Sequence, residues 1–148
     1  MTNKIFQIEI SDRLDISPPF LMIDVYEEIT TGERAIGTKH LKSDDWFLNC
    51  HLPKDQAMPA TLQTEGMLQT LVLLIYSKED HGDHRSFITD SKVKFKSSPE
   101  PGHDIIYEAQ LLSFRRGIAK GTVVGTSNGK EICSGEFTYA SPHLMVLR

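Results

Sequence analysis

Residues 50–76 read CHLPKDQAMPATLQTEGMLQTLVLLIY, and this stretch decides how the rest of the chain is organised. Proline is favoured in the first turn of a helix, where its missing N–H would have no partner, so Pro59 predicts a helix start. The residues that follow are apolar almost all the way round, which is typical of a buried helix. A helix over residues 59–79 would be roughly 31 Å long at about 1.5 Å per residue, enough to cross a small domain.

Two side chains of this stretch stand out as candidates for acid–base chemistry. His51 lies in a short loop that Pro53 restricts, and Glu65 lies in the second turn of the predicted helix. Histidine titrates near neutral pH and often acts as a general base. A carboxylate is costly to bury unless it has a partner or a function. These two residues are therefore the first candidates for a catalytic role.

The remainder of the chain alternates between extended segments and turns. We expect strands over residues 20–26, 34–41, 86–96, 104–114, 118–126 and 130–140. Short helical turns are expected at 11–14 and 46–48, and a polar turn that includes His81 and His84 should follow the long helix. Asn128-Gly129 is a strong hairpin signal, and we expect the last four strands to form a meander.

These elements predict an α+β fold in which an antiparallel sheet of about six strands wraps round one long central helix. The length favours a single domain over residues 1–148. One sheet covers only part of such a helix, and an open sheet has edges that can pair with another chain. We therefore also expect a dimer.

Composition narrows the class of protein. The net charge is −4 and the isoelectric point is about 5.8, whereas nucleic-acid-binding proteins are usually basic. The two cysteines and six histidines show neither a disulfide framework nor metal-ligand spacing. The N-terminus is too polar for a signal peptide, and the longest apolar run is too short to span a membrane. We expect a cytoplasmic protein without a metal, a nucleic-acid partner or a membrane association.

Several motifs follow one another along the chain: Pro19-Phe20-Leu21-Met22-Ile23-Asp24, Cys50-His51-Leu52-Pro53, Met58-Pro59-Ala60, Glu65-Gly66-Met67-Leu68-Gln69, Lys92-Val93-Lys94-Phe95-Lys96, Pro101-Gly102 and Arg115-Arg116-Gly117-Ile118-Ala119-Lys120. Together they resemble the FabZ-type β-hydroxyacyl-acyl carrier protein dehydratases of the hot-dog fold, whose hallmark reads Gly-His-Phe-Pro, Met-Pro-Gly and Glu-Ala-x-x-Gln. The resemblance covers roughly residues 16–142.

The resemblance implies a hot-dog fold and the dehydration of 3-hydroxyacyl thioesters on acyl carrier protein, in fatty acid or related lipid or polyketide biosynthesis. It implies that His51 is the base and that Glu65 of the partner chain is the acid, in a homodimer or a trimer of dimers. It implies no cofactor beyond the phosphopantetheine arm of the carrier protein. The matched positions give further substrate-binding residues, which are Ala60, Thr61, Gln69, Phe95, Arg115 and Arg116.

Three positions depart from the family pattern. Cys50 and Ala60 stand where the family has glycine, and Ser17-Pro18 replaces its usual His-Arg. A larger residue at position 50 strains the backbone if that position needs a positive φ. The added side chains also narrow the expected pocket, so these differences bear on substrate size.

Dehydration of such a thioester sets requirements that these residues can meet. A base must remove a proton from Cα, an acid must protonate the leaving hydroxyl, and donors must stabilise an enolate-like oxygen. Histidine titrates in the right range, and a buried Glu65 could stay protonated. The helix start at Ala60-Thr61 offers unpaired N–H groups and a partial positive charge. The residues alone leave open which of His51 and Glu65 is the base.

Other interpretations of the same residues remain open. Taken alone, His51 fits an ordinary loop histidine, Glu65 a core carboxylate satisfied by N–H groups, and Gln69 a core hydrogen bond. Cys50 is more typical of a packing cysteine than of a Cys–His nucleophile pair. Five basic residues form either a solvated face or a patch for an acidic carrier protein, namely Lys94, Lys96, Lys120, Arg115 and Arg116.

Three other functions use the same kind of fold. A hot-dog thioesterase would hydrolyse the thioester with an activated water, and a non-catalytic module would only bind the acyl group. An isomerase-dehydratase shares the fold, but that group carries aspartate where this chain has Glu65.

Overall fold

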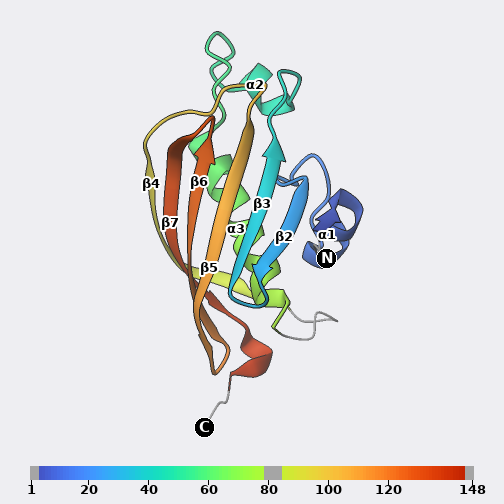
Figure 1. Ribbon diagram of the computed structural model, residues 1–148, viewed down its shortest axis with the longest axis vertical. Helices are drawn as coiled ribbons and strands as arrows, with labels where there is room; N and C mark the ends of the chain where they lie inside the picture. Colours follow the sequence, from blue (N-terminus) through green and yellow to red (C-terminus); the bar gives the residue numbers. More distant parts are fainter. Residues whose placement is uncertain (1–3, 79–84, 146–148) are drawn as a thin grey trace.

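The computed structural model describes residues 4–78 and 85–145. A seven-stranded antiparallel sheet lies against one long helix, α3, which runs behind it in Figure 1. The helices are α1 (Gln7–Leu14), α2 (Trp46–Cys50), α3 (Ala60–Tyr76) and a 3₁₀ turn (Pro142–Leu144). The strands are β1 (Lys4–Phe6), β2 (Val25–Thr30), β3 (Arg34–His40), β4 (Phe87–Phe95), β5 (Asp104–Arg115), β6 (Ile118–Ser127) and β7 (Lys130–Ala140). The predicted α+β arrangement of a sheet on one central helix is confirmed.

Helix α3 is shorter than the expected span of residues 59–79. Pro59 has extended backbone angles and is the N-cap, so the helix begins at Ala60 and not at the proline. The carbonyl of Pro59 accepts the first hydrogen bonds, from the N–H groups of Leu62 at 3.0 Å and Gln63 at 3.1 Å. The helix ends at Tyr76. Ser77 and Lys78 follow the helix as a turn, whereas Glu79 and the expected turn with His81 and His84 lie outside the described residues.

The sheet order is β1-β2-β3-β5-β6-β7-β4, so the predicted four-strand meander is wrong. Strands β5, β6 and β7 do form a meander, but β4 pairs with β7 at the far edge, with Ser91 opposite Phe137. The turns at Gly117 and Gly129 are tight and have positive φ, which fixes both hairpins. Residues 96–103 are too many for a tight turn, and they return the chain to β5 beside β3.

The apolar run over residues 20–26 is mostly not a strand, which corrects a second expectation. Strand β2 begins only at Val25, and the preceding segment places Leu21, Met22 and Ile23 in the core without strand pairing. Because a continuous apolar run reports burial more reliably than backbone conformation, the pattern fits a buried loop equally well. The short strand β1 was not expected, and it pairs with β2 to make the seventh strand.

Helix α3 lies close to the sheet because glycines remove side chains from the contact. A Cβ atom at Gly66 would lie 2.5 Å from the ring of Tyr107, and one at Gly37 would lie 2.2 Å from Thr70 Oγ1. Such distances leave no room for a side chain, so both positions require glycine. The helix side chains on this face are fully buried, as Met67, Leu71 and Leu74 illustrate.

The other side of α3 is only partly covered. Thr61 is exposed, and Thr64, Glu65, Leu68 and Val72 are half-buried. These positions repeat every three or four residues and therefore form one stripe along the helix. Edge strand β4 also exposes three large apolar side chains, which are Phe87, Ile88 and Phe95.

None of the helices within residues 4–78 and 85–145 is long and apolar enough to cross a bilayer. The same residues contain no cluster of three or more histidine, cysteine, aspartate or glutamate side chains that could hold a metal ion.

Candidate active site

His51 is held at the end of the short helix α2. Its backbone N–H donates to the carbonyl of Phe47 at 3.0 Å, and Phe47 and Leu48 anchor the helix in the core. At the other end of α2, the Asp45 carboxylate accepts from the N–H of Lys42 at 2.9 Å and from Lys39 Nζ at 3.5 Å. Both ends of the short helix are therefore tied to the body of the domain.

The imidazole of His51 has a defined orientation. Its Nδ1 lies 2.9 Å from the carbonyl oxygen of Ala57, across a loop in which the N–H of Gln56 donates to the carbonyl of Leu52 at 2.9 Å. A carbonyl can only accept a hydrogen bond, so Nδ1 carries the proton in this arrangement. The neutral ring then has its lone pair on Nε2. That nitrogen is the one able to act as a base.

Glu65 is held by Gln69, one turn further along α3. The Gln69 Nε2 donates to Glu65 Oε2 at 3.0 Å and to the carbonyl of Phe20 at 3.1 Å, while its Oε1 accepts from the N–H of Met22 at 2.8 Å. Gln69 is 1% exposed, and the three bonds engage both N–H groups and the oxygen of its side-chain amide. The contacts show that Gln69 is more than a core hydrogen-bonding residue, because one of its N–H groups orients the candidate acid.

The environment of Glu65 favours the protonated acid. Burial raises the pKa of the Glu65 carboxyl above its usual range, and the hydrogen bond from Gln69 opposes this effect only in part. Tyr139 on β7 lines the same cleft as Glu65, and the charge of Glu65 adds to burial in raising the pKa of the Tyr139 phenol. Burial therefore shifts the Glu65 carboxyl towards its protonated form, which is the form that can donate a proton.

Glu65 lines an open cleft of about 410 Å³. One wall is the stripe of α3 with Leu68 and Val72, and the facing wall comes from the end of α1 and the loop after it, with Leu14 and Ile16. These walls are apolar. The cleft could therefore take a hydrocarbon chain beside the carboxyl.

The start of α3 carries a second group suited to the chemistry. The first N–H groups of a helix have no partner within it, and no side chain caps them at Pro59. Ala60 and Thr61 are exposed at this position. Together with the partial positive charge of the helix end, these donors can bind an oxygen that becomes negative during a reaction.

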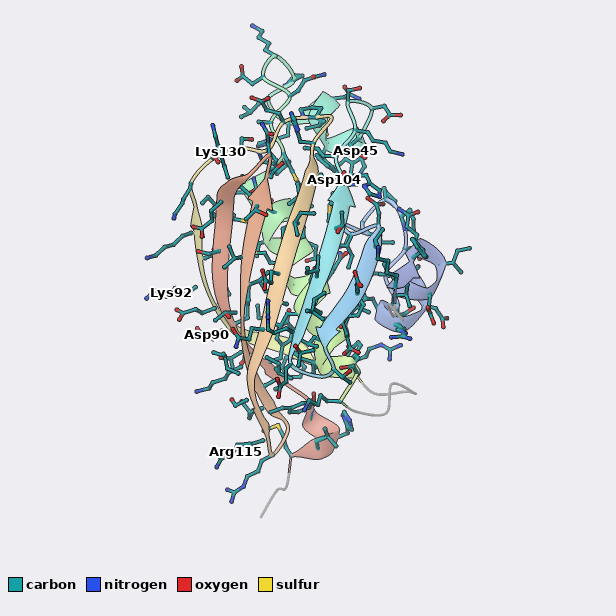
Figure 2. All side chains as sticks on the ribbon, in the orientation of Figure 1. Asp45, Asp90, Lys92, Asp104, Arg115 and Lys130 are labelled. Atoms are coloured by element: carbon teal, nitrogen blue, oxygen red, sulfur yellow. The ribbon has the colours of Figure 1, made fainter. Side chains whose placement is uncertain are left out.

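The residues expected at the site do not all come together in one chain. His51 does not line the cleft that contains Glu65, and no hydrogen bond joins the two side chains within the described residues. Phe95 lies on edge strand β4, opposite Cys133. Arg115 lies at the opposite end of the sheet from Asp45, which caps the helix that holds His51 (Figure 2), and Arg116 is next to it in the β5–β6 turn.

Cys50 resolves two of the questions that the sequence raised. It is the last residue of α2, and it is not among the described residues with positive φ, so the replacement of glycine leaves no strain there. Its Sγ donates to the carbonyl of Trp46 at 3.5 Å and not to the imidazole. The hydrogen bonds of Cys50 therefore give no support to a Cys–His nucleophile pair, and the exposed side chain is not the core packing cysteine that we expected.

Sequence reasoning missed several groups that shape the site. The carbonyls of Ala57 and Phe20 and the N–H of Met22 are backbone atoms, so no residue type could have indicated them. Tyr139 occupies an inward position of β7, which strand alternation does predict. Its closeness to Glu65 depends on how α3 lies against the sheet.

Comparisons with known proteins show the family to which the chain belongs. A family model described as a FabA-like domain matches residues 16–136. The chain is 34% identical over 123 residues to the 3-hydroxyacyl-acyl-carrier-protein dehydratase FabZ of Geobacillus thermodenitrificans, covering 82% of this chain and 85% of that protein. It is 33% identical over 131 residues to the dehydratase FabZ of Caldicellulosiruptor bescii, covering 86% and 94%.

Among solved structures, the chain is similar to thioesterase superfamily member 2 of zebra fish. The TM-score is 0.68 with 18% identity, over 91% of this chain and 94% of that one. The mouse protein of the same name gives a TM-score of 0.67 with 14% identity, over 90% and 92%. At these identities the likeness concerns the fold alone, and it confirms the hot-dog fold. From the fold and the sequence matches together, the chain belongs to the FabA-like family of hot-dog proteins, alongside the FabZ-type dehydratases.

Proposed function

We propose that this protein removes water from 3-hydroxyacyl thioesters on acyl carrier protein and forms trans-2-enoyl thioesters. The observation that carries the proposal is a complementary pair of groups. His51 has its Nδ1 fixed on a carbonyl, which leaves Nε2 as a base, and Glu65 lies in an apolar cleft with a raised pKa. The enzyme class of the FabZ relatives supports the same reaction.

In the proposed reaction, Nε2 of His51 takes the proton from Cα of the substrate. The electrons of that C–H bond form the Cα–Cβ double bond, and the C–O bond at Cβ breaks. Glu65 gives its proton to the departing hydroxyl, which leaves as water. The N–H groups at the start of α3 hold the thioester oxygen while it carries negative charge. Proton exchange with solvent restores both residues.

We propose that the two groups meet across a dimer. Edge strand β4 has one neighbour, β7, so the backbone groups along its other side are available to pair with another strand. Its exposed apolar side chains and the partly covered stripe of α3 favour a second copy of this chain as that neighbour. A two-fold axis there would bring His51 of one chain towards Glu65 of the other.

The same symmetry gives Arg115 and Arg116 a role. A two-fold axis perpendicular to the sheet turns the second copy end for end, so its β5–β6 turn points towards the end of the molecule that holds His51. The adjacent arginines could then attract the acidic carrier protein or the phosphate of its phosphopantetheine arm. Phe95, on the inner side of β4, would lie near the shared site.

Hydration of a short enoyl thioester, the reverse reaction, tests the proposal most simply. The purified protein should remove the enoyl absorbance, and His51→Ala and Glu65→Gln should each abolish this. His103→Ala and Glu108→Gln change exposed residues of the same types and should leave the rate unchanged. Release of free thiol without hydration would indicate a thioesterase, and binding without turnover would indicate a non-catalytic module.

A further inference from the structure

The proposed reaction releases a water molecule beside Glu65, in a cleft that has several apolar walls. The apolar side chains are Leu14, Ile16, Leu68 and Val72. An acyl chain in the cleft would displace solvent from these walls, and an enclosed water molecule typically makes about three hydrogen bonds. The leaving oxygen therefore needs a polar partner from the protein in addition to the carboxyl of Glu65.

Most of the polar side chains that line the cleft already have partners. The side-chain amide of Gln69 makes three hydrogen bonds. The guanidinium of Arg85 lies 3.7 Å from the carboxylate of Asp15. The Oη of Tyr76 accepts from the backbone N–H of Ser86 at 3.3 Å, and the Oγ of Ser86 is enclosed by protein and cannot be reached from the cleft. These five side chains are thus engaged or enclosed.

Tyr139 differs from these residues, because its hydroxyl is both unpaired and accessible. Its side chain lines the cleft and is 4% exposed. Within the described residues, the Oη of Tyr139 makes no hydrogen bond, yet it is not one of the unpaired oxygens that are sealed from solvent, as those of Tyr26 and Tyr107 are. The oxygen of Tyr139 therefore opens onto the cleft.

Strand β7 holds this phenol in place, and burial keeps it protonated. Tyr139 lies between two pairing strands, opposite Ala119 of β6 and Ile88 of β4. Burial, together with the charge of Glu65, raises the pKa of the Tyr139 phenol above its usual value. Its O–H is therefore available as a hydrogen-bond donor at neutral pH.

We propose that Tyr139 is a further catalytic residue, whose Oη donates a hydrogen bond to the 3-hydroxyl of the substrate and holds that oxygen against the Glu65 carboxyl. The inference rests on the proposed function, because it takes the leaving hydroxyl to lie beside Glu65. As the C–O bond at Cβ breaks, Glu65 supplies the proton that completes the water, and Tyr139 keeps its own. The oxygen gains negative charge in this step, so the hydrogen bond from Tyr139 strengthens in the transition state.

The test is Tyr139→Phe, which removes the hydroxyl and keeps the ring. Two unreactive pantetheine amides, with nitrogen in place of the thioester sulfur, serve as probes: one carries the 3-hydroxyl, and the other has hydrogen there. Tyr139→Phe should weaken binding of the hydroxyl-bearing amide about five- to tenfold, the factor that one neutral hydrogen bond supplies, and leave binding of the other amide unchanged. The kcat/KM for dehydration of the 3-hydroxyacyl thioester should fall by at least this factor.

Tyr26→Phe is the matched control, because Tyr26 is similarly buried but its Oη is enclosed on β2, away from the cleft. It should leave the ratio of the two dissociation constants unchanged. Equal weakening of both amides by Tyr139→Phe would indicate a packing role, and unchanged binding and kcat/KM would exclude the contact; either result overturns the inference while the dehydratase proposal stands. If the wild-type protein turns over no thioester, the dehydratase proposal is wrong, and the two dissociation constants then decide the inference alone.

Discussion

Replacing Gln69 with leucine measures how much the side-chain amide of Gln69 contributes to the stability of the fold and to the pKa of Glu65. The substitution leaves the N–H of Met22 and the carbonyl of Phe20 without their partner. Each unpaired group costs about 1–3 kcal/mol, and the added apolar surface of leucine returns roughly 1 kcal/mol. The expected loss in the free energy of unfolding is therefore about 3 kcal/mol, from a typical total of about 5–15 kcal/mol.

Gln63→Leu is the matched control on the same helix. Gln63 is 3% exposed, but its Nε2 makes a single long bond to the carbonyl of Met58 at 3.5 Å, and its Oε1 has no partner within the described residues. Replacement of Gln63 should lower the free energy of unfolding by less than about 1 kcal/mol, since one weak hydrogen bond is lost and an unpaired oxygen is removed.

Urea unfolding at one fixed protein concentration measures both variants, since the stability of the proposed dimer would depend on concentration. A Gln69→Leu loss no larger than that of Gln63→Leu would refute the reasoning. A second readout concerns Glu65. The Gln69 bond lowers the pKa of the carboxyl, so its removal should raise that pKa further. Because Glu65 must be protonated to act as the acid in dehydration, the alkaline limb of the pH profile for dehydration should then move to higher pH.

Three further predictions follow from the fold and the site. Burial raises the pKa of Glu65 in the folded chain, so wild-type stability should fall as pH rises from the ordinary carboxyl value of 4.5 towards the raised pKa; Glu65→Gln should lack this fall in unfolding measurements across pH. Gly66→Ala forces a methyl group to 2.5 Å from the Tyr107 ring and should cost about 1–3 kcal/mol, or more if the ring cannot move, measured by thermal unfolding. Arg115→Glu with Arg116→Glu should slow turnover of carrier-protein substrates far more than that of pantetheine thioesters, and equal losses would instead indicate a structural role.

Much of the fold could be predicted from local patterns. A segment that is apolar on every side of a helix predicted α3, and the glycine turns at 117 and 129 predicted the β5–β6–β7 hairpins. These features depend on neighbours in sequence. The position of β4 was missed because alternation identifies a strand without indicating its partner, and a loop of several residues allows more than one. The segment over residues 20–24 was missed because burial and strand conformation give the same apolar run.

The site was predictable as a set of side chains but not as a geometry. His51 and Glu65 stood out by residue type and by spacing, and Gln69 stood out by its match to the family motif. The atoms that orient them are the carbonyls of Ala57 and Phe20 and the N–H of Met22, which any residue would supply.

The central claim is that His51 of one chain and Glu65 of another complete one site. The direct test mixes inactive His51→Ala chains with inactive Glu65→Gln chains and follows hydration of an enoyl thioester after subunit exchange. With equal amounts and random pairing, half of the dimers carry both chain types, and each of these regains one of its two sites. The account therefore predicts recovery of about a quarter of wild-type activity. No recovery after exchange has been demonstrated by mass spectrometry would contradict a site shared between chains.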